Sequence, residues 1–100
     1  MVMYKIVFTK QALKDLDNLK KSGLSSKAKT LVDVIRENPY QNPPRYEKLV
    51  GNLEGTLSRR INIQHRLVYQ IYEECFVEND IEYQGTIKII RMWTHYDGVK

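Results

Sequence analysis

The sequence predicts an α+β fold in which an N-terminal strand and a two-helix hairpin pack on a twisted, mainly antiparallel sheet. Between residues 10 and 37, apolar residues recur at three- and four-residue spacings, which is the period of a helix that buries one face. After residue 56 the period changes to two, as in strands. Because the later segments are joined by short turns, they predict antiparallel pairing, with the helices covering one face of the sheet.

The first half begins with a strand and a helix. Residues 4–8, Tyr-Lys-Ile-Val-Phe, are β-branched and aromatic, which predicts the strand. A helix is expected from Lys10 to about Lys21. The side-chain oxygen of Thr9 can cap its N-terminus, and Gly23 follows as a stop signal. The strand is therefore expected to lead directly into the helix.

A second helix and a proline-rich loop complete this half. The helix is expected to begin after Ser25 or Ser26. It should end before the Asn38-Pro39 pair, because proline lacks the amide hydrogen that a helix interior requires. Residues 38–46 contain all three prolines and predict a loop within one domain, not a domain boundary.

Three strands are expected in the second half. Apolar and polar residues alternate, or strand-forming residues are frequent, in three segments: 57–63, 67–71 and 86–94. The acidic stretch 78–80 predicts a hairpin tip. In the first of these strands the odd-numbered residues share one face and the even-numbered residues share the other.

The length and composition are those of one small domain, residues 1–100. An apolar content of 42% in 100 residues is enough for one modest core, and the chain is too short for two domains. Charged residues interrupt every hydrophobic stretch, so none approaches the roughly 20 residues that span a bilayer. The single cysteine, Cys75, has no partner for a disulfide, and the N-terminus has no cleavage-site pattern. We therefore expect a cytoplasmic protein without membrane association.

Basic residues dominate outside one acidic segment. The formal net charge is +4, but residues 73–82 hold five of the 12 acidic residues and none of the 16 basic ones. Twelve acidic residues less these five leave seven, so the rest of the chain has a net charge of +9. Such an excess attracts a polyanion through phosphate contacts and counterion release. Nucleic acid is therefore the first partner to consider, with simple solubility as the alternative explanation.

Several classes of enzyme find no support in the sequence. The two histidines, His65 and His95, are far apart and Cys75 has no neighbouring ligand motif, so neither a metal site nor a cofactor is expected. No glycine-rich phosphate loop follows a strand, and no serine stands in a nucleophile elbow. Metal-free acid-base chemistry remains. RNA suits it because the 2′-hydroxyl is a built-in nucleophile, and cleavage then needs a base, an acid and a cation beside the phosphate.

The segment from Glu47 to Tyr69 resembles a known family signature. It reads EKLVGNLEGTLSRRINIQHRLVY, and it matches every fixed position of the pattern E-x-L-x-x-N-L-x-G-x-x-S-R-R-I-x-x-x-H-R-L-V-Y. The helical hairpin before it and a closing strand that ends in His95-Tyr96 extend the resemblance over nearly the whole chain. The pattern is that of the YoeB-type (Txe/YoeB) toxins of the RelE/ParE superfamily, which are ribosome-dependent mRNA endonucleases.

This resemblance implies a role for individual residues. Glu47 would be the general base, Arg66 would stabilise the phosphate, and His95 would be the general acid. Substrate binding is implied for four further residues: Lys48, Arg59, Arg60 and Tyr96. Val50 replaces a lysine that is common in the family, and residues 97–100 extend past the terminal aromatic, so the substrate contacts are where this chain departs from the pattern.

Spacing alone would not single out the three catalytic residues. Glu47 follows the proline-rich loop, where an exposed carboxylate is the ordinary case. Arg66 is expected on the opposite face from Leu67, where it could form a structural salt bridge. His95 could simply end a strand, although an imidazole with a pKa of about 6.5 is among the few groups that donate a proton at cellular pH. His65 is expected to be structural, at the turn between two strands.

The function implied by the resemblance is that of the toxin in a type II toxin-antitoxin pair. Such a toxin cleaves mRNA in the small-subunit decoding site of the ribosome, without a metal, and leaves a 2′,3′-cyclic phosphate or a 3′-phosphate. Its partners would be a cognate antitoxin and, in a homodimer, a second copy of itself. Two alternatives stay open: an inactive RNA- or antitoxin-binding module of the same fold, and a fold relative that poisons DNA gyrase.

Overall fold

The computed structural model describes residues 3–49, 55–62 and 65–93. Along the chain its elements are β1 (Met3–Phe8), α1 (Lys10–Lys21), α2 (Ser25–Glu37), β2 (Tyr46–Lys48), β3 (Thr56–Arg60), β4 (Arg66–Tyr72), β5 (Phe76–Glu78) and β6 (Ile81–Arg91). The strands form a sheet with the order β1-β6-β4-β3-β2, and β5 pairs with β6. β1 is parallel to β6, and the other pairs among the described strands are antiparallel.

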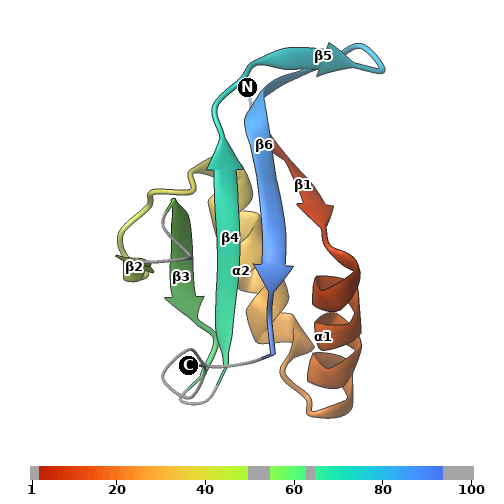
Figure 1. Ribbon diagram of the computed structural model, residues 1–100, viewed down its shortest axis with the longest axis vertical. Helices are drawn as coiled ribbons and strands as arrows, with labels where there is room; N and C mark the ends of the chain where they lie inside the picture. The colour runs from red at the N-terminus through yellow and green to blue at the C-terminus, as the bar shows by residue number, and fades with distance from the viewer. Residues whose placement is uncertain (1–2, 50–54, 63–64, 94–100) are drawn as a thin grey trace.

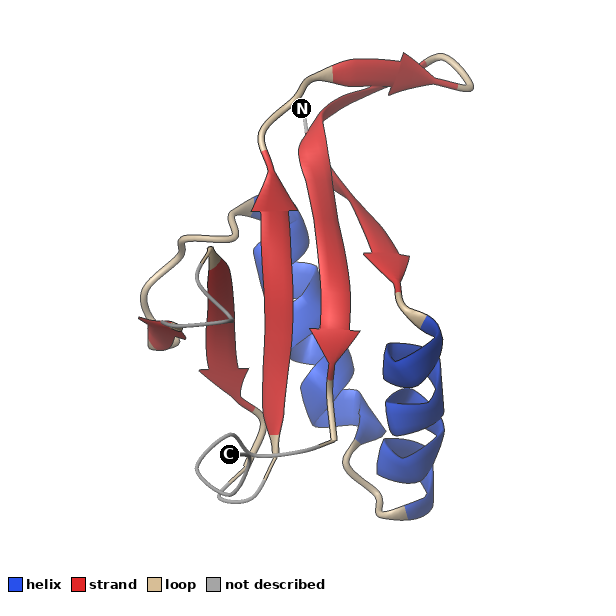
Figure 2. Ribbon diagram, viewed as in Figure 1, coloured by secondary structure: helices blue, strands red, loops and turns tan. Residues whose placement is uncertain are grey.

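The helices lie against this sheet as the sequence predicted. In Figure 1, α2 passes behind β4, and α1 lies beside the lower end of β6. Figure 2 shows the same division into two helices and a sheet. The predicted α+β class is therefore confirmed, with the parallel β1-β6 pair as the exception in a mainly antiparallel sheet. Among the described residues, neither helix is long and apolar enough to cross a membrane.

α1 has the bounds that the sequence predicted. Its first turn is capped by Thr9, whose side-chain oxygen accepts a hydrogen bond from the backbone nitrogen of Ala12 at 3.0 Å. After its last turn, Gly23 has a φ of 75°, in the left-handed region that glycine adopts without a steric penalty. Local signals therefore account for both ends of this helix.

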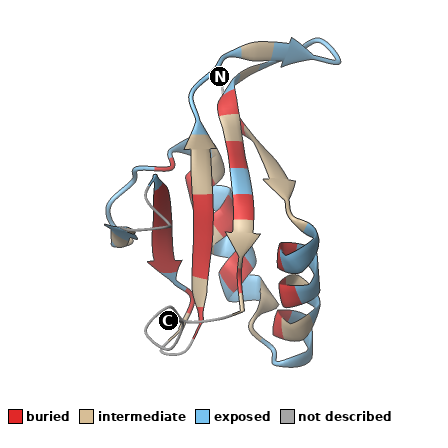
Figure 3. Ribbon diagram, in the orientation of Figure 1, coloured by how far each residue is buried: buried red, intermediate tan, exposed pale blue. Residues whose placement is uncertain are grey.

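α2 also agrees with the prediction and supplies part of the core. Its buried residues Ala28, Val32 and Ile35 recur at three- and four-residue spacings, so they share one face of the helix. Figure 3 shows that buried residues lie on α2 and along the middle of the sheet. The centre of the core is a set of fully buried side chains from helices and strands: Leu19, Ile35, Leu67, Tyr69, Ile87 and Ile89.

The strands nearest the signature differ from the prediction at their ends. A loop was expected as far as residue 46, but Tyr46–Lys48 forms β2 because these residues pair with β3. The predicted strand 57–63 ends early, at Arg60. The backbone nitrogens of Ile61 and Asn62 both donate to the carbonyl of His65, at 2.8 and 3.2 Å, and so close the turn to β4 instead of extending the ladder. Residue 63 lies outside the described residues.

The last strand is longer than predicted at its start. It begins at Ile81 and not at residue 86, because β5, which the sequence analysis did not predict, pairs with its first residues. The expected hairpin tip is confirmed, since Asn79 and Asp80 have φ values of 52° and 65°, as two-residue hairpin turns require. β6 ends at Arg91, and residue 94 lies outside the described residues.

A buried ion pair joins α1 to the end of β6. The side chain of Asp15 is 1% exposed, and its Oδ2 accepts hydrogen bonds from Nε of Arg91 at 2.8 Å and from the backbone nitrogen of Met92 at 3.0 Å. Its Oδ1 accepts from Gln11 at 3.0 Å. Burial acts to raise the pKa of Asp15, but the hydrogen bonds from these three groups outweigh it and hold that pKa below its ordinary value. The chain just before Trp93 is therefore fixed to α1.

Candidate active site

Four polar side chains share one face of the sheet where β2, β3 and β4 lie side by side (Figure 1). Glu47 on β2 is directly opposite Ser58 on β3. Arg60 on β3 is directly opposite Arg66 on β4. Because directly opposed side chains of antiparallel strands point to the same side, and residues two apart on a strand do too, all four lie on one face. The predicted orientation of Arg66, away from the core residue Leu67, agrees with this register.

Glu47 and Arg66 form an ion pair across this face. Nη1 of Arg66 donates to Oε1 of Glu47. The arginine side chain is only 13% exposed, whereas 48% of the glutamate side chain is exposed. The cation is thus held by its surroundings, and the carboxylate remains open to solvent. Two of the three residues expected to be catalytic are therefore in direct contact.

A pocket of about 270 Å³ opens around this pair. It is lined by Pro44, Arg45, Glu47, Ser58, Arg60 and Arg66. Three guanidinium groups against one carboxylate give it a positive lining, which suits a phosphate group because arginine donates to phosphate oxygens in a bidentate geometry. Arg60, for which the family resemblance implied a substrate contact, is among the residues around this pocket. The sequence analysis missed Arg45, because it lies in the segment expected to be a loop, where strand alternation does not indicate which side a residue faces.

Arg59 does not reach this pocket, although a substrate contact was implied for it. The residue is 0% exposed, because odd-numbered residues of β3 point into the core. Its Nε donates to the hydroxyl of Tyr69 at 2.9 Å, and its two terminal nitrogens donate to the backbone carbonyls of Pro44 and Pro39. The guanidinium also lies over the ring of Tyr46, 5.1 Å from its centroid. We therefore assign Arg59 a structural role in place of the implied one.

The contacts of Arg59 fix the proline-rich loop that leads into β2. Tyr69 takes part, since its hydroxyl donates to the carbonyl of Pro39 at 2.9 Å. Burial raises the pKa of Tyr69, although the charge of Arg59 beside it acts in the opposite direction. This buried cluster positions the chain immediately before Glu47. Arg59 and Tyr69 therefore affect the site only through the position of the chain that leads to Glu47.

Lys48 is also separated from the pocket. Adjacent residues of a strand point to opposite faces, so Lys48 points away from the face that carries Glu47. It lines a different cavity, of about 420 Å³, together with Tyr40, Leu49 and Ile71. The structure therefore does not bring Lys48 together with the residues around Arg66.

His95 and Tyr96 lie outside the described residues, but the chain leading to them is described up to Trp93. The ring of Trp93 stacks on the ring of His65, with centroids 4.0 Å apart and an angle of 18° between the planes. Nδ1 of His65 also contacts the backbone carbonyl of Trp93. Because His65 directly precedes Arg66, these contacts hold the chain two residues before His95 beside the start of β4. The structural role expected for His65 agrees with them.

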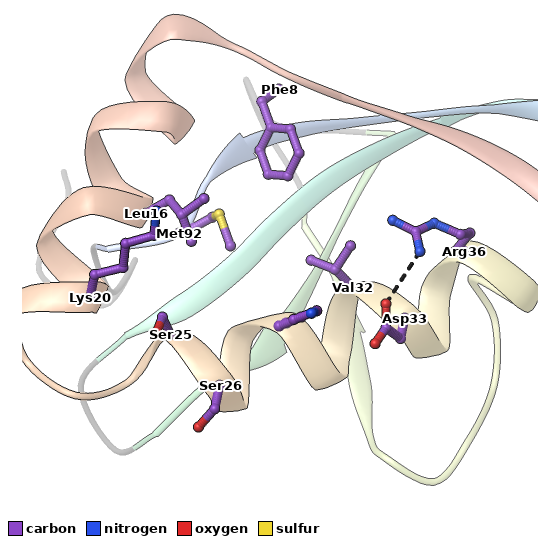
Figure 4. A pocket seen from close by; sticks show the side chains of 10 residues that line it. Phe8, Leu16, Lys20, Ser25, Ser26, Val32, Asp33, Arg36 and Met92 are labelled. Atoms are coloured by element: carbon purple, nitrogen blue, oxygen red, sulfur yellow. Dashed lines mark hydrogen bonds and ion pairs between the residues drawn. The ribbon is translucent and has the colours of Figure 1, made fainter.

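A larger cavity, of about 430 Å³, lies elsewhere, between the two helices (Figure 4). Apolar side chains such as Phe8, Leu16 and Met92 line it, with Lys20 and Arg36 among the polar residues around it. Among the described residues that line it, neither Glu47 nor Arg66 is found. Its apolar lining also makes it a poorer place for phosphate chemistry than the pocket around Arg66.

Comparisons with known proteins agree with the signature. The model of the family described as YoeB-like toxins of bacterial type II toxin-antitoxin systems matches residues 8–96. Toxin YoeB of a Synechocystis species is 39% identical over 71 residues, which cover 67% of this chain and 80% of that protein.

Solved structures share the fold. A YoeB/ParE toxin from Agrobacterium tumefaciens has a TM-score of 0.76 at 23% identity, over 92% of this chain and 99% of that one. A chain of the YoeB-YefM complex from Staphylococcus aureus has a TM-score of 0.66 at 32% identity, over 93% of this chain and 98% of that one. The family model covers almost the whole chain, from β1 past the end of β6, and the chain therefore belongs to the YoeB-like toxin family of bacterial type II toxin-antitoxin systems.

Proposed function

We propose that this toxin is a metal-independent endoribonuclease that cleaves mRNA in the decoding site of the ribosome, with Glu47 as general base, Arg66 as phosphate-binding cation and His95 as general acid. The observation that carries the proposal is the contact between Glu47 and Arg66 within an arginine-lined pocket. A carboxylate beside a cation on an open sheet face combines a proton acceptor with a phosphate ligand, and RNA cleavage needs both.

In this mechanism Glu47 takes the proton of the 2′-hydroxyl, and the 2′-oxygen attacks the adjacent phosphorus. The bond to the 5′-oxygen of the next nucleotide breaks, His95 protonates that oxygen, and a 2′,3′-cyclic phosphate remains. Arg66, together with Arg60 and Arg45 around the pocket, neutralises the growing charge on the phosphate oxygens. Because the carboxylate of Glu47 is half-exposed, it can exchange its contact with Arg66 for one with the ribose.

The position of Trp93 supports the role of His95. Trp93 is the last described residue of the chain and precedes His95 by two positions in the sequence. Trp93 is stacked on His65, the neighbour of Arg66. The last described residue before His95 therefore lies beside the start of β4, where Arg66 stands, and this supports the assignment of His95 as the acid. In the same arrangement Tyr96 would contact the substrate.

The partners of this toxin follow from its relatives and its charge. The Staphylococcus aureus relative was solved in complex with YefM and also as a dimer, so we assign this chain a cognate antitoxin and a homodimeric form. The net charge of +9 outside residues 73–82 favours approach to the phosphate-rich ribosome in the cytoplasm. Ribosomes loaded with mRNA are therefore the substrate to test.

The test compares the wild-type toxin with Glu47→Gln and His95→Ala on ribosomes that carry a defined mRNA. Removing a general base or acid is expected to slow cleavage by roughly 10²- to 10⁴-fold. Glu74→Gln, which changes an exposed carboxylate outside the pocket, is the matched control and should leave the rate unchanged. Equal cleavage by all four proteins would exclude these catalytic assignments. Binding of mRNA or antitoxin without any cleavage by the wild type would identify an inactive binding module, and inhibition of DNA gyrase instead would identify a gyrase poison.

A further inference from the structure

The hydroxyl of Ser58 is buried without a hydrogen-bond partner. Among the described residues, its Oγ is the buried side-chain polar atom left unpaired, and Ser58 is 1% exposed. The large majority of buried polar side-chain atoms in folded proteins are hydrogen bonded, because an unpaired one destabilises the fold. Ser58 also lines the pocket around Arg66. A free hydroxyl at the wall of a positively charged pocket is therefore available to a ligand.

The neighbours of Ser58 explain how it is both buried and close to the substrate. β3 lies between β2 and β4, so the ion pair of Glu47 on β2 with Arg66 on β4 crosses over β3. Ser58 is directly opposite Glu47, and Arg60, on the same face of β3, is directly opposite Arg66. The ion pair thus passes over the part of β3 that carries Ser58. A substrate phosphate that took the place of Glu47 at Arg66 would therefore lie next to Ser58.

We infer that Ser58 is a further substrate-binding residue, whose hydroxyl donates a hydrogen bond to a non-bridging oxygen of the scissile phosphate. The inference deepens the proposed endoribonuclease function and rests on it. The arginines around the pocket select an anion, and a hydroxyl is a suitable donor to a phosphate oxygen. The carboxylate of Glu47, directly opposite Ser58, could also accept this proton, but the hydroxyl makes no hydrogen bond to it in the structure, so the proton is available to a phosphate oxygen.

This hydrogen bond contributes mainly to the rate of the cleavage step. Negative charge on the non-bridging oxygens increases as the 2′-oxygen attacks the phosphorus, and a donor already aimed at them binds the transition state more strongly than the substrate. Loss of the hydroxyl should therefore lower the rate of bound toxin more than its affinity for the ribosome. A residue that only packed against its neighbours would change neither.

The rival explanation is that position 58 requires only a small side chain. An ion pair that crosses β3 leaves little room beneath it, and serine is small. Alanine is smaller still and has no polar atom, so Ser58→Ala separates the two explanations. It should fold at least as stably as the wild type, because it removes an unpaired buried hydroxyl, while cleavage slows.

The experiment measures single-turnover cleavage of ribosome-bound mRNA and urea unfolding for the same proteins. Ser58→Ala is expected to slow cleavage by on the order of 10²-fold with an unfolding midpoint no lower than that of the wild type. Ser58→Cys keeps the shape of the side chain, but its thiol is a weak donor, so its cleavage rate should lie between those of the wild type and Ser58→Ala. Ser26→Ala, at an exposed serine of α2, is the control and should match the wild type.

A substrate with one non-bridging oxygen replaced by sulfur gives a second readout. The wild type should cut one phosphorothioate diastereomer more slowly, because sulfur is a weak acceptor, and Ser58→Ala should reduce that difference. If Ser58→Ala cleaves at the wild-type rate while Glu47→Gln is inactive, the role of Ser58 is excluded and the proposed function stands. If the wild type itself cuts no mRNA on the ribosome, the proposed function is excluded, and the role of Ser58 with it.

Discussion

Replacing Asp15 should destabilise the fold, and the contacts of its carboxylate indicate by how much. Its carboxylate accepts from Arg91, Met92 and Gln11 while only 1% exposed. Asparagine keeps the shape and one acceptor oxygen but removes the charge. A hydrogen bond to a charged group contributes about 1.5–3 kcal/mol and a neutral one about 0.5–1.5 kcal/mol, so Asp15→Asn should cost about 1–2 kcal/mol.

Asp15→Ala should cost more, because it removes every acceptor. Breaking a buried pair typically costs about 3–5 kcal/mol, and the 32% exposure of the Arg91 side chain places this case near 3 kcal/mol, since the arginine regains water. In a domain of this size each kcal/mol lowers the melting temperature by roughly 4–8 °C. The matched control is Asp17→Asn on the same helix, whose exposed pair with Lys21 at 3.9 Å is worth about 0–1 kcal/mol.

The pH dependence gives an independent check. The folded-state pKa of Asp15 lies below its ordinary value of 3.8, so the folded protein binds fewer protons here than the unfolded chain. The stabilisation is therefore complete above the ordinary value and is lost as the pH falls through the folded-state pKa. Urea unfolding of wild type and Asp15→Asn should show a stability difference that is constant near neutral pH and shrinks in acid. A difference that stays constant down to about pH 3, or no difference at neutral pH, would refute this reasoning.

Two further substitutions test the packing of the fold. Gly85→Ala should cost about 3 kcal/mol or more, because a Cβ there would lie 2.3 Å from the carbonyl oxygen of Tyr72 and 2.9 Å from the ring of Tyr4; an unchanged urea midpoint would contradict this. Arg59→Met should cost about 3 kcal/mol, because the Tyr69 hydroxyl and the Pro44 carbonyl lose the donor that Arg59 provides, and the Pro39 carbonyl keeps only the hydrogen bond from Tyr69. A melting temperature equal to the wild type would show that the guanidinium contributes nothing to the fold.

Local sequence signals were sufficient where the physical cause is local. Thr9 and Gly23 set the ends of α1 through backbone groups within a few residues, so the predicted bounds were correct. The odd-even alternation placed Arg66 on the opposite face from Leu67 for the same reason. β2 was missed because its three residues are a strand only by pairing with β3, which lies later in the chain. No property of Tyr46–Lys48 alone predicts that partner.

The same distinction between local and tertiary causes applies to the residues of the site. The sequence by itself determined the family, through a pattern of residues that includes Glu47 and Arg66, and it determined which side of each strand those residues occupy. Only the tertiary structure decided that these two side chains meet across β3, that Arg59 is a core residue while its neighbour Arg60 lines the pocket, and that Ser58 is buried without a partner. The physical reason is that the direction of a side chain follows from backbone geometry within one strand, whereas its burial and its partners depend on strands brought together from distant parts of the chain.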